Sequence, residues 1–420
     1  MSPNENTVII VGAGVSGLLL AQSLQKCKIP YQIFERDANL TARGVGWGLT
    51  LHWSLPALRQ LLPEELFRRI PETYVDRVSV EEGRASRFPF FDLSSGELKA
   101  ATPAASESQR IRMSRQRFRE LIAEGIDIQW SKGVASAESR EETVTAHFDD
   151  GSSVTGRLLV ACDGGNSRSR RALFPERHTY KIPIGVLGVK AEYTPEQMEP
   201  LQKLDPVFLQ GTASGNDTYA YFSILNSPGN HPSSNTQADP GYILQIVISW
   251  PLRSGFLSKP DLVPLPASKQ DSLELIKIFA ASWAEPFQSL AMNISPDSEI
   301  KSLELYDWLP PKEVPSLGNI ALVGDAFHPM SMYRGEGANH AIVDVLDLIE
   351  TVIPHLASDK ATLQTAVQTY QNAVAARARP GVLASRQACL DAHDWGRISS
   401  DSPLLTRRAM KLDFDDSAFD

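Results

Sequence analysis

Three glycines, Gly12, Gly14 and Gly17, follow a run of four apolar residues near the start of the chain, and Glu35 follows a second apolar run. Glycines at this spacing after a strand allow a tight turn, a close approach of backbone N–H groups to a pyrophosphate, and close packing of the next helix on the strand. The positive end of that helix then faces the phosphates. A carboxylate at Glu35 can accept hydrogen bonds from an adenosine ribose and disfavours a 2′-phosphate. These residues predict a site for FAD or NAD rather than NADP; the alternative is a glycine turn with a structural role.

A second set of candidate cofactor-binding residues lies in the last third of the chain. Asp325 follows the apolar run from Ile320 to Val323, where its carboxylate can bind a hydroxyl-rich chain such as ribityl. Shortly after it, Gly337, Ala338 and Asn339 open a predicted helix. The helix N-terminus would place partial positive charge beside a flavin ring, which becomes anionic on reduction. Taken alone, this set also fits a strand-ending turn and a loop before a helix.

A third set supports the flavin interpretation. Asp163 and Gly164 directly follow another apolar run, Leu158 to Cys162. In an open parallel sheet, ligands bind outside the carboxyl ends of the strands, where all three sets would lie. Their combination favours FAD over unrelated turns.

The elements that must position these residues alternate between strands and helices along much of the chain. Continuous apolar runs predict buried parallel strands, and apolar residues at helical spacing predict the helices. The predicted parallel strands are 8–11, 31–34, 158–162 and 320–323, and the predicted helices are 51–62, 114–123 with Ser114 as N-cap, 273–290, 338–350 and most of the chain beyond 361. The predicted antiparallel parts are an excursion over 77–98, a hairpin of 144–148 with 154–155, and a layer with strands 185–191, 219–225 and 242–250. The polar stretch 226–239 is predicted to be a mobile loop.

The predicted fold class is therefore α/β: a discontinuous Rossmann-like FAD-binding domain with an inserted antiparallel β-sheet substrate domain and a C-terminal helical segment. The predicted FAD-binding domain comprises residues 1–80, 101–177 and 300–360. The predicted substrate domain comprises 81–100 and 178–299, and the helical segment 361–420.

Composition limits the partners that the protein could have. The formal net charge of −9 over 420 residues argues against nucleic acid as a partner. Three cysteines far apart indicate neither a disulfide framework nor a metal site. The polar start of the chain leaves no room for a signal peptide, and no apolar stretch is long enough to span a bilayer. We therefore expect a soluble cytoplasmic protein without a metal, either a monomer or a homodimer.

With these motifs the chain resembles the class A, single-component FAD-dependent monooxygenases, a family of aromatic hydroxylases and epoxidases. The resemblance covers roughly residues 6–175 and 300–350 and implies a role for each matching residue. It places Gly12, Gly14 and Gly17 at the FAD pyrophosphate, Glu35 with Arg36 at the adenosine end, and Gly48 in a loop beside the flavin. It implies that Arg115 reaches FAD and that Asp163 and Gly164 serve both FAD and NAD(P)H. The implied ribityl and pyrimidine contacts are Asp325, Gly337, Ala338 and Asn339.

The resemblance also implies a reaction. NAD(P)H would reduce FAD, and O₂ would form a flavin C4a-hydroperoxide that transfers one oxygen atom to an aromatic or alkene-bearing small molecule, such as a secondary metabolite. Lys190 and Tyr221 are the predicted substrate-orienting residues, each alternatively a structural residue of the sheet. Further pocket candidates are His52, Trp53, Tyr333 and Arg334, and His328 is predicted to be structural. The segment from Ala326 to Arg334 departs from the family pattern, which puts the shape of the oxygen pocket in doubt.

Two other functions remain open at this stage. The first is a flavin enzyme without oxygenation, such as an FAD reductase or a halogenase, although the halogenase Trp-x-Trp-x-Ile-Pro motif is absent. The second is a non-catalytic flavin-binding redox sensor, which would show no substrate-stimulated oxidation of NAD(P)H.

Overall fold

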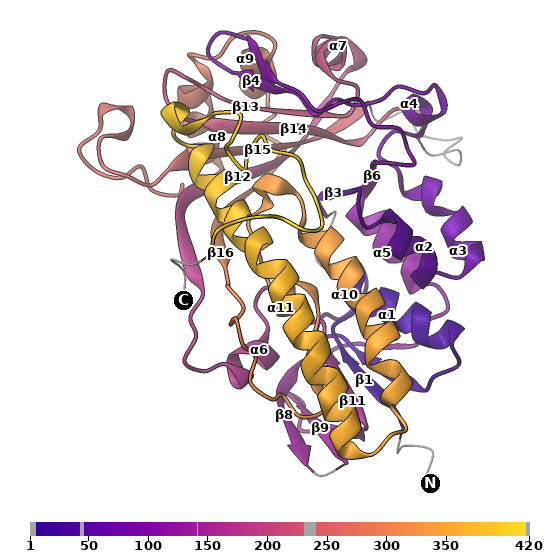
Figure 1. The fold of residues 1–420 in the computed structure, drawn as a ribbon. Helices are drawn as coiled ribbons and strands as arrows, with labels where there is room; N and C mark the ends of the chain where they lie inside the picture. The colour runs from indigo at the N-terminus through magenta and orange to yellow at the C-terminus, as the bar shows by residue number, and fades with distance from the viewer. Residues whose placement is uncertain (1–5, 43–45, 141, 231–240, 417–420) are drawn as a thin grey trace.

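The computed structural model describes residues 6–42, 46–140, 142–230 and 241–416. The two large sheets lie in different halves of the molecule, and the long helix α11 (Lys360–Asp391) runs beside α10 (Gly337–Thr351) from one half to the other (Figure 1). The fold is mixed α/β, as predicted. Among the described residues no helix combines the length and the apolar character that a membrane crossing requires.

A five-stranded sheet forms the core of one half, in the order β17-β11-β1-β2-β7, and every neighbouring pair in it is parallel. The apolar runs are buried on both faces because helices cover the sheet, which confirms the parallel strands predicted from the sequence. The strands are β1 (Val8–Val11), β2 (Tyr31–Phe34), β7 (Ile128–Gln129), β11 (Leu158–Ala161) and β17 (Ile320–Leu322). The helices of this half include α1 (Val15–Lys26), α2 (Leu55–Leu61), α3 (Glu64–Arg68), α5 (Arg115–Ala123) and α6 (Arg168–Leu173).

Two small antiparallel sheets accompany this core. The predicted hairpin is present as β9 (Thr143–Phe148) and β10 (Ser153–Gly156). A third strand that was not predicted, β8 (Val134–Arg140), pairs with β9. A ribbon of β3 (Gly48–Leu51) and β6 (Ile111–Ser114) leads into α5, whose N-cap is Ser114 as predicted.

The second large sheet has seven strands in the order β16-β12-β15-β14-β13-β4-β5, and all pairs are antiparallel except β13 with β4. Its strands are β4 (Phe90–Asp92), β5 (Leu98–Ala100), β12 (Tyr180–Tyr193), β13 (Phe208–Thr212), β14 (Tyr219–Asn226), β15 (Tyr242–Pro251) and β16 (Glu299–Asp307). Because side chains alternate along a strand, the sheet has two unlike faces. The apolar face packs under α7 (Pro195–Leu204), α8 (Lys269–Ala280) and α9 (Phe287–Met292).

The other face of this sheet, here called the polar face, carries Lys190, Gln245, Ser249, Ser223 and Tyr221 in cross-strand register. It looks toward the parallel-sheet half of the molecule. Gln245 accepts a hydrogen bond from the backbone N–H of Gly48 at 3.0 Å, and Ser249 accepts one from Tyr333 at 2.7 Å. The fold therefore sets a layer of polar side chains above the carboxyl ends of the parallel strands.

Three sequence predictions are corrected by the structure. The predicted helix 51–62 begins only at Leu55, because the residues before it belong to β3 and its loop. The excursion 77–98 opens instead with helix α4 (Arg77–Glu81), capped by the Asp76 side chain. The predicted helix 273–290 is two helices, since Pro286 has no N–H to donate and disfavours helical backbone in the residue before it.

Two further predictions concern the domain boundaries and the loop over 226–239. The proposed boundary near residue 300 falls at the start of β16, which pairs with β12, so the seven-stranded sheet continues beyond it. The domain boundaries stay a prediction. Most of the loop predicted over 226–239 lies outside the described residues.

Candidate active site

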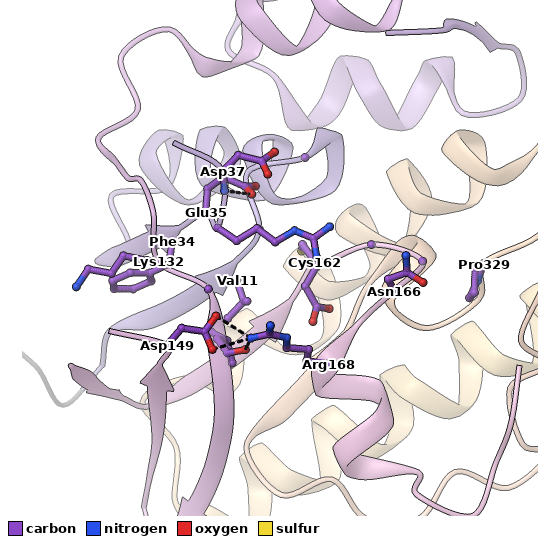
Figure 2. Close-up of a pocket in the computed structure, with 18 of the residues that line it drawn as sticks. Val11, Phe34, Glu35, Asp37, Lys132, Asp149, Cys162, Asn166, Arg168 and Pro329 are labelled. Carbon is purple, nitrogen blue, oxygen red and sulfur yellow. Dashed lines mark hydrogen bonds and ion pairs between the residues drawn. The ribbon is translucent and has the colours of Figure 1, made fainter. Parts of the chain in front are cut away.

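A cavity of about 600 Å³ opens at the carboxyl ends of β1, β2 and β11 (Figure 2). This edge is where open parallel sheets bind their ligands, and pockets of this kind measure roughly 300–1,000 Å³. The sequence-predicted residues that line the cavity are Gly12, Gly14, Glu35, Arg36, Arg115, Asp163 and Gly164. Seven candidates drawn from four separate segments of the chain therefore share one wall.

The three glycines of the first motif have different roles. Gly12 has φ +102°, and a Cβ there would lie 2.4 Å from the carbonyl oxygen of Cys162. A Cβ on Gly17 would lie 1.9 Å from the carbonyl oxygen of Gly12. Gly14 has no heavy atom within 4 Å of the corresponding position and faces the cavity. Two glycines thus permit the turn and its packing, and the third leaves space for a ligand at the start of α1.

Glu35 ties the glycine turn to β2. Its side chain is buried at 6% exposure. One carboxylate oxygen accepts a hydrogen bond from the backbone N–H of Ala13 at 2.8 Å, and the other accepts from Asp37 at 3.0 Å. Glu35 therefore fixes the turn in addition to lining the cavity, and its contact with a ribose stays a prediction.

Arg119 is a site residue that the sequence analysis did not select. It follows Arg115 by four residues on α5, so both side chains lie on one face of the helix. Its guanidinium donates to the carbonyl oxygen of Ala13 at 2.8 Å and lies 4.0 Å from Glu35. The sequence does carry a signal for Arg119: residues 110–119 are rich in arginine, and Arg119 follows Arg115 at helical spacing within them.

The far wall of the cavity also contains residues that the sequence analysis missed. Asp149 follows β9, and both its carboxylate oxygens lie 2.7 Å from Arg168 (Figure 2). Lys132 precedes β8 and hydrogen-bonds Ser152 at 2.8 Å. These residues come from exposed polar stretches, which resemble any solvated surface, so no sequence signal marked them.

Asp163 has one carboxylate oxygen that no protein group satisfies. Its Oδ2 accepts from the N–H and the hydroxyl of Ser169 at 3.3 and 3.2 Å. Its Oδ1 is buried without a hydrogen-bond partner, and Asp163 lines the cavity. Buried polar groups are nearly always paired, so this oxygen indicates a missing donor, such as a ligand hydroxyl.

Arg170 joins the Asp163 segment to the Asp325 segment. Its guanidinium donates to the carbonyl oxygens of Asp325 and Ala326 at 3.0 Å each, and to that of Gly165 at 2.6 Å. Two motifs about 160 residues apart in the chain are thereby held side by side.

Asp325 lies close to the N-terminus of α10. A Cβ on Gly337 would lie 3.7 Å from the Asp325 carboxylate. The surrounding protein raises the pKa of Asp325 by desolvation, although the side chain itself is exposed. Gly337 and Ala338 are in the first turn of α10, where backbone N–H groups have no partner within the helix.

Asn339 is fully engaged within the protein. Its side-chain oxygen accepts from the His52 N–H at 2.9 Å and from the Ser54 hydroxyl at 2.8 Å, and its amide donates to the Thr50 carbonyl at 3.0 Å. The side chain therefore fastens α10 to the segment after β3. Because the side chain is engaged, only the backbone N–H of Asn339 is left for the predicted contact with a flavin. That contact stays a prediction.

Lys190 and Tyr221 lie on the same polar face but in different surroundings. Lys190 lines a second cavity of about 330 Å³, which shares Arg115 and Arg119 with the first. Tyr221 contacts Arg112 and two phenylalanines instead. The ring of Trp47, which also lines the second cavity, lies against Gly188, the residue in register with Tyr221 across β15. The strand predicted over 185–191 is longer in the structure, since β12 continues to Tyr193, so Lys190 is not at its end.

The remaining pocket candidates divide into buried and partly open groups. Tyr333 and Arg334 are buried, the first bonded to Ser249 and the second ion-paired with Glu336 at 2.6 Å. His328 is fully buried with its Nε2 2.6 Å from Asp344, an arrangement typical of a structural histidine. His52 and Trp53 are only partly covered.

The described residues fit FAD on structural grounds. The glycine turn at α1, the open space at Gly14 and the unpaired oxygen of Asp163 lie in one cavity. Asp325 and the first turn of α10 lie next along the same edge. The fold and this site define a flavin-binding protein of the doubly wound type.

Comparisons with known proteins agree. The family described as FAD binding domain matches residues 5–221. A protein of Arthroderma benhamiae named "Probable FAD-dependent monooxygenase" is 41% identical, over 97% of this chain and 96% of its own length. The FAD-dependent monooxygenase dbaB of Emericella nidulans is 38% identical, over 82% of this chain and 86% of its own length. The solved structure of 2,6-dihydroxypyridine-3-hydroxylase from Arthrobacter nicotinovorans shares the fold with a TM-score of 0.73 and 18% identity, over 96% of this chain and 97% of that one.

The chain belongs to the FAD-dependent monooxygenases. The resemblance drawn from its motifs, the fold class and FAD as the cofactor are confirmed.

Proposed function

We propose that this monooxygenase takes electrons from NAD(P)H and inserts one oxygen atom of O₂ into an aromatic or alkene-bearing small molecule, by hydroxylation or epoxidation. The observation that carries the proposal is the polar face of the seven-stranded sheet, set directly above the cofactor edge of the parallel sheet. Bound FAD would supply the redox chemistry and the activation of O₂. The protein's own residues must bind, orient and shield the substrate.

The cofactor-side residues have separable tasks in this proposal. Gly12, Gly14 and Gly17 shape the turn that receives the pyrophosphate, and Glu35 holds that turn. Asp163 and Asp325 accept hydrogen bonds from cofactor hydroxyls. The first turn of α10 donates N–H groups to the ring edge that becomes negative on reduction.

On the substrate side, Lys190 and Tyr221 are the proposed orienting residues. Both are partly uncovered on the polar face, and the Tyr221 hydroxyl has no hydrogen-bond partner among the described residues. Because Lys190 lines the second cavity and Tyr221 contacts Arg112 and two phenylalanines, we assign them separate contacts. Tyr221 would face the substrate, whereas Lys190 would act in the second cavity, on the substrate or on the nicotinamide donor.

The first test is an anaerobic visible spectrum of the purified, FAD-loaded protein before and after NADPH is added. Bleaching of the flavin bands would support the proposed donor. Oxygen uptake that a small aromatic compound stimulates would then support oxygenation. Bleaching without any stimulated uptake across a panel of phenols would favour a reductase or a sensor and contradict the proposal.

Lys190→Met and Tyr221→Phe test the orienting residues. Each should retain FAD and lose about tenfold or more in stimulated NADPH oxidation, because a hydrogen bond or charge at the substrate is removed. Lys203→Met on the exposed side of α7 and Tyr180→Phe at the exposed start of β12 are the matched controls. Unchanged rates in Tyr221→Phe would remove that residue from the proposed site.

A further inference from the structure

Three aromatic rings form a cluster at the edge of the polar face. Phe88 lies 4.8 Å from Phe208 between ring centroids, and Tyr221 lies 6.4 Å from each of them. Phe208 is buried, whereas Phe88 and Tyr221 are only partly covered. We call these three residues the aromatic cluster. It presents apolar surface beside the Tyr221 hydroxyl.

Three guanidinium groups surround the aromatic cluster. Arg110 lies 5.4 Å from the centroid of Phe208 and Arg112 lies 6.0 Å from it. Arg408, from the C-terminal segment, lies 5.2 Å from Phe88. We call the three residues the arginine cluster. Each cation is within range of an aromatic face, a contact that is favourable but weaker than an ion pair.

The arginine cluster has hydrogen-bonding capacity to spare. An arginine side chain carries five N–H donors. Arg112 uses three of its nitrogens, which donate to Ser223, Thr50 and Gln245 at 3.1 Å each. All three partners are neutral, so they hold the guanidinium in place without balancing its charge.

The other two arginines are held in the same way. Arg408 donates to the backbone carbonyl oxygens of Arg334, Thr406 and Leu404 at 3.4, 3.0 and 2.9 Å. Arg110 donates to one backbone carbonyl and one threonine hydroxyl. Within the described part of the chain, no carboxylate oxygen lies within 4.0 Å of any of the three guanidinium groups.

The nearby acids are already engaged elsewhere. Glu336 forms a buried ion pair with Arg334 at 2.6 Å. One oxygen of Asp205 accepts two backbone N–H groups, those of Val207 at 3.0 Å and Phe208 at 3.1 Å, and the other accepts a third. Because charge is costly to bury without a partner, three gathered cations with no paired anion need an explanation.

The arginine cluster is surrounded by protein but not covered. Desolvation lowers the pKa of Arg110 and Arg112 and lowers that of Arg408 to about 10. All three side chains nevertheless retain accessible surface. The guanidinium N–H groups that no protein group uses are therefore accessible to a ligand.

The arginine cluster adjoins the cofactor edge. A Cβ on Gly48 would lie 2.3 Å from the Arg112 guanidinium; Gly48 begins β3 instead of lying in a loop as predicted, so the start of β3 rests on this cation. His52 is bonded through its backbone to Asn339 at the start of α10. Burial, and then the charges of Arg408 and Arg110, lower the pKa of His52 to about 3. The positive field of the cluster thus reaches the first turn of α10.

We propose that the arginine cluster and the aromatic cluster together bind a substrate that carries a planar oxyanion conjugated to an aromatic ring, with the anion on Arg112 and the ring against Phe88 and Tyr221. Guanidinium and carboxylate, or guanidinium and phenolate, form charge-assisted hydrogen bonds in one plane. The proposal rests on the proposed function, because it names the class of substrate for the same site.

The test uses the FAD-loaded protein and two probes, a hydroxynaphthoate and its methyl ester. At about pH 7 the acid is ionised and the ester carries no carboxylate. Dissociation constants are measured by isothermal titration calorimetry for the wild type, Arg112→Gln, Arg112→Lys and Arg408→Gln. Arg140→Gln, on the exposed strand β8, is the control for loss of one cation.

We expect the wild type to bind the acid about tenfold or more tightly than the ester, and Arg112→Gln to abolish that difference. Arg112→Lys should restore part of it, and Arg140→Gln should match the wild type. If the ester binds tightly only as its phenol ionises at higher pH, and Arg112→Gln abolishes this, the bound anion is a phenolate. Equal constants for both probes in the wild type and in Arg112→Gln, or no binding of either probe, would overturn the proposal.

FAD content and thermal unfolding of each variant check that it folds. Arg408→Gln, which alters a different segment, provides a second test if Arg112→Gln does not fold. Binding is read without turnover, so the proposed oxygenation can fail while this proposal stands, and the reverse also holds.

Discussion

The indole ring of Trp47 occupies the space above Gly188 that any other residue's Cβ would need. A Cβ on residue 188 would lie 2.1 Å from Cη2 of Trp47 and 2.9 Å from Cζ2. Glycine at this point of β12 therefore lets the tryptophan rest on the polar face, where both Trp47 and Gly188 line the cavity of Lys190.

Gly188→Ala should displace Trp47 and lower the free energy of unfolding by about 1–3 kcal/mol, the usual range for an overpacked contact. Thermal unfolding and tryptophan fluorescence measure the two effects. Trp47→Ala combined with Gly188→Ala should recover much of the loss that the glycine substitution causes, which a double-mutant cycle would detect. Gly396→Ala is the matched control, since its Cβ would meet its nearest atom at 3.5 Å. Additive effects of the two substitutions would show that the contact carries no energy.

Glu35→Gln should weaken FAD binding by about tenfold and lower stability slightly. A glutamine side chain has one acceptor oxygen, so it cannot accept from both Ala13 and Asp37 as the carboxylate does. Hydrogen bonds to a charged group contribute about 1.5–3 kcal/mol. Flavin fluorescence during titration of the FAD-free protein gives the dissociation constant. Glu138→Gln, exposed on β8, is the control, and equal affinities in the two variants would show that the Glu35 carboxylate is not needed.

Much of the parallel sheet follows from the sequence because its signals are local. Four apolar runs end at glycine or acidic residues, and their burial on both faces needs no long-range information. β8 was missed because Val134 is its only buried residue, so it has no apolar pattern. α4 was missed because its cap, Asp76, precedes only one turn of helix.

The arrangement of side chains within the site was less predictable. Asn339 reads as a ligand residue in a glycine-rich turn, yet its amide is used by His52 and Thr50, nearly 290 residues earlier. Lys190 and Tyr221 belong to predicted strands that follow each other along the chain, 185–191 and 219–225, but in the sheet β15 lies between β12 and β14. The order of strands across a sheet depends on tertiary packing, which a local pattern does not encode.

Asp325→Ala should lower FAD retention more than Asp325→Asn does. Both changes remove the charge, but asparagine keeps an oxygen that can accept from a ribityl hydroxyl. The ratio of flavin to protein absorbance after gel filtration measures retention. Asp297→Ala, at an exposed turn before β16, is the control. A full flavin complement in Asp325→Ala would refute the ribityl assignment.

His52 should make stability depend on pH below neutrality. Burial and the charges of Arg408, Arg110 and Arg334 lower its pKa to about 3 in the folded protein, against about 6.5 in the unfolded chain. Between these values the unfolded state binds more protons than the folded state. The free energy of unfolding therefore falls as the pH falls from about 6.5 toward 3, by at most about 1.4 kcal/mol per pH unit for one group.

His52→Gln removes this group, so its stability should decline less steeply over the same pH range. Buried His340 and His393, whose pKa values are also lowered, remain in the variant. The charge of His52 is the smallest of the named causes that lower the pKa of His340, so the two curves differ mainly through His52 itself. Urea unfolding at a series of pH values gives both curves, with His178→Gln as the exposed control. Parallel curves for the wild type and His52→Gln would mean that His52 has the same pKa in the folded and unfolded states, and the positive field assigned to the arginine cluster would then not reach the start of α10.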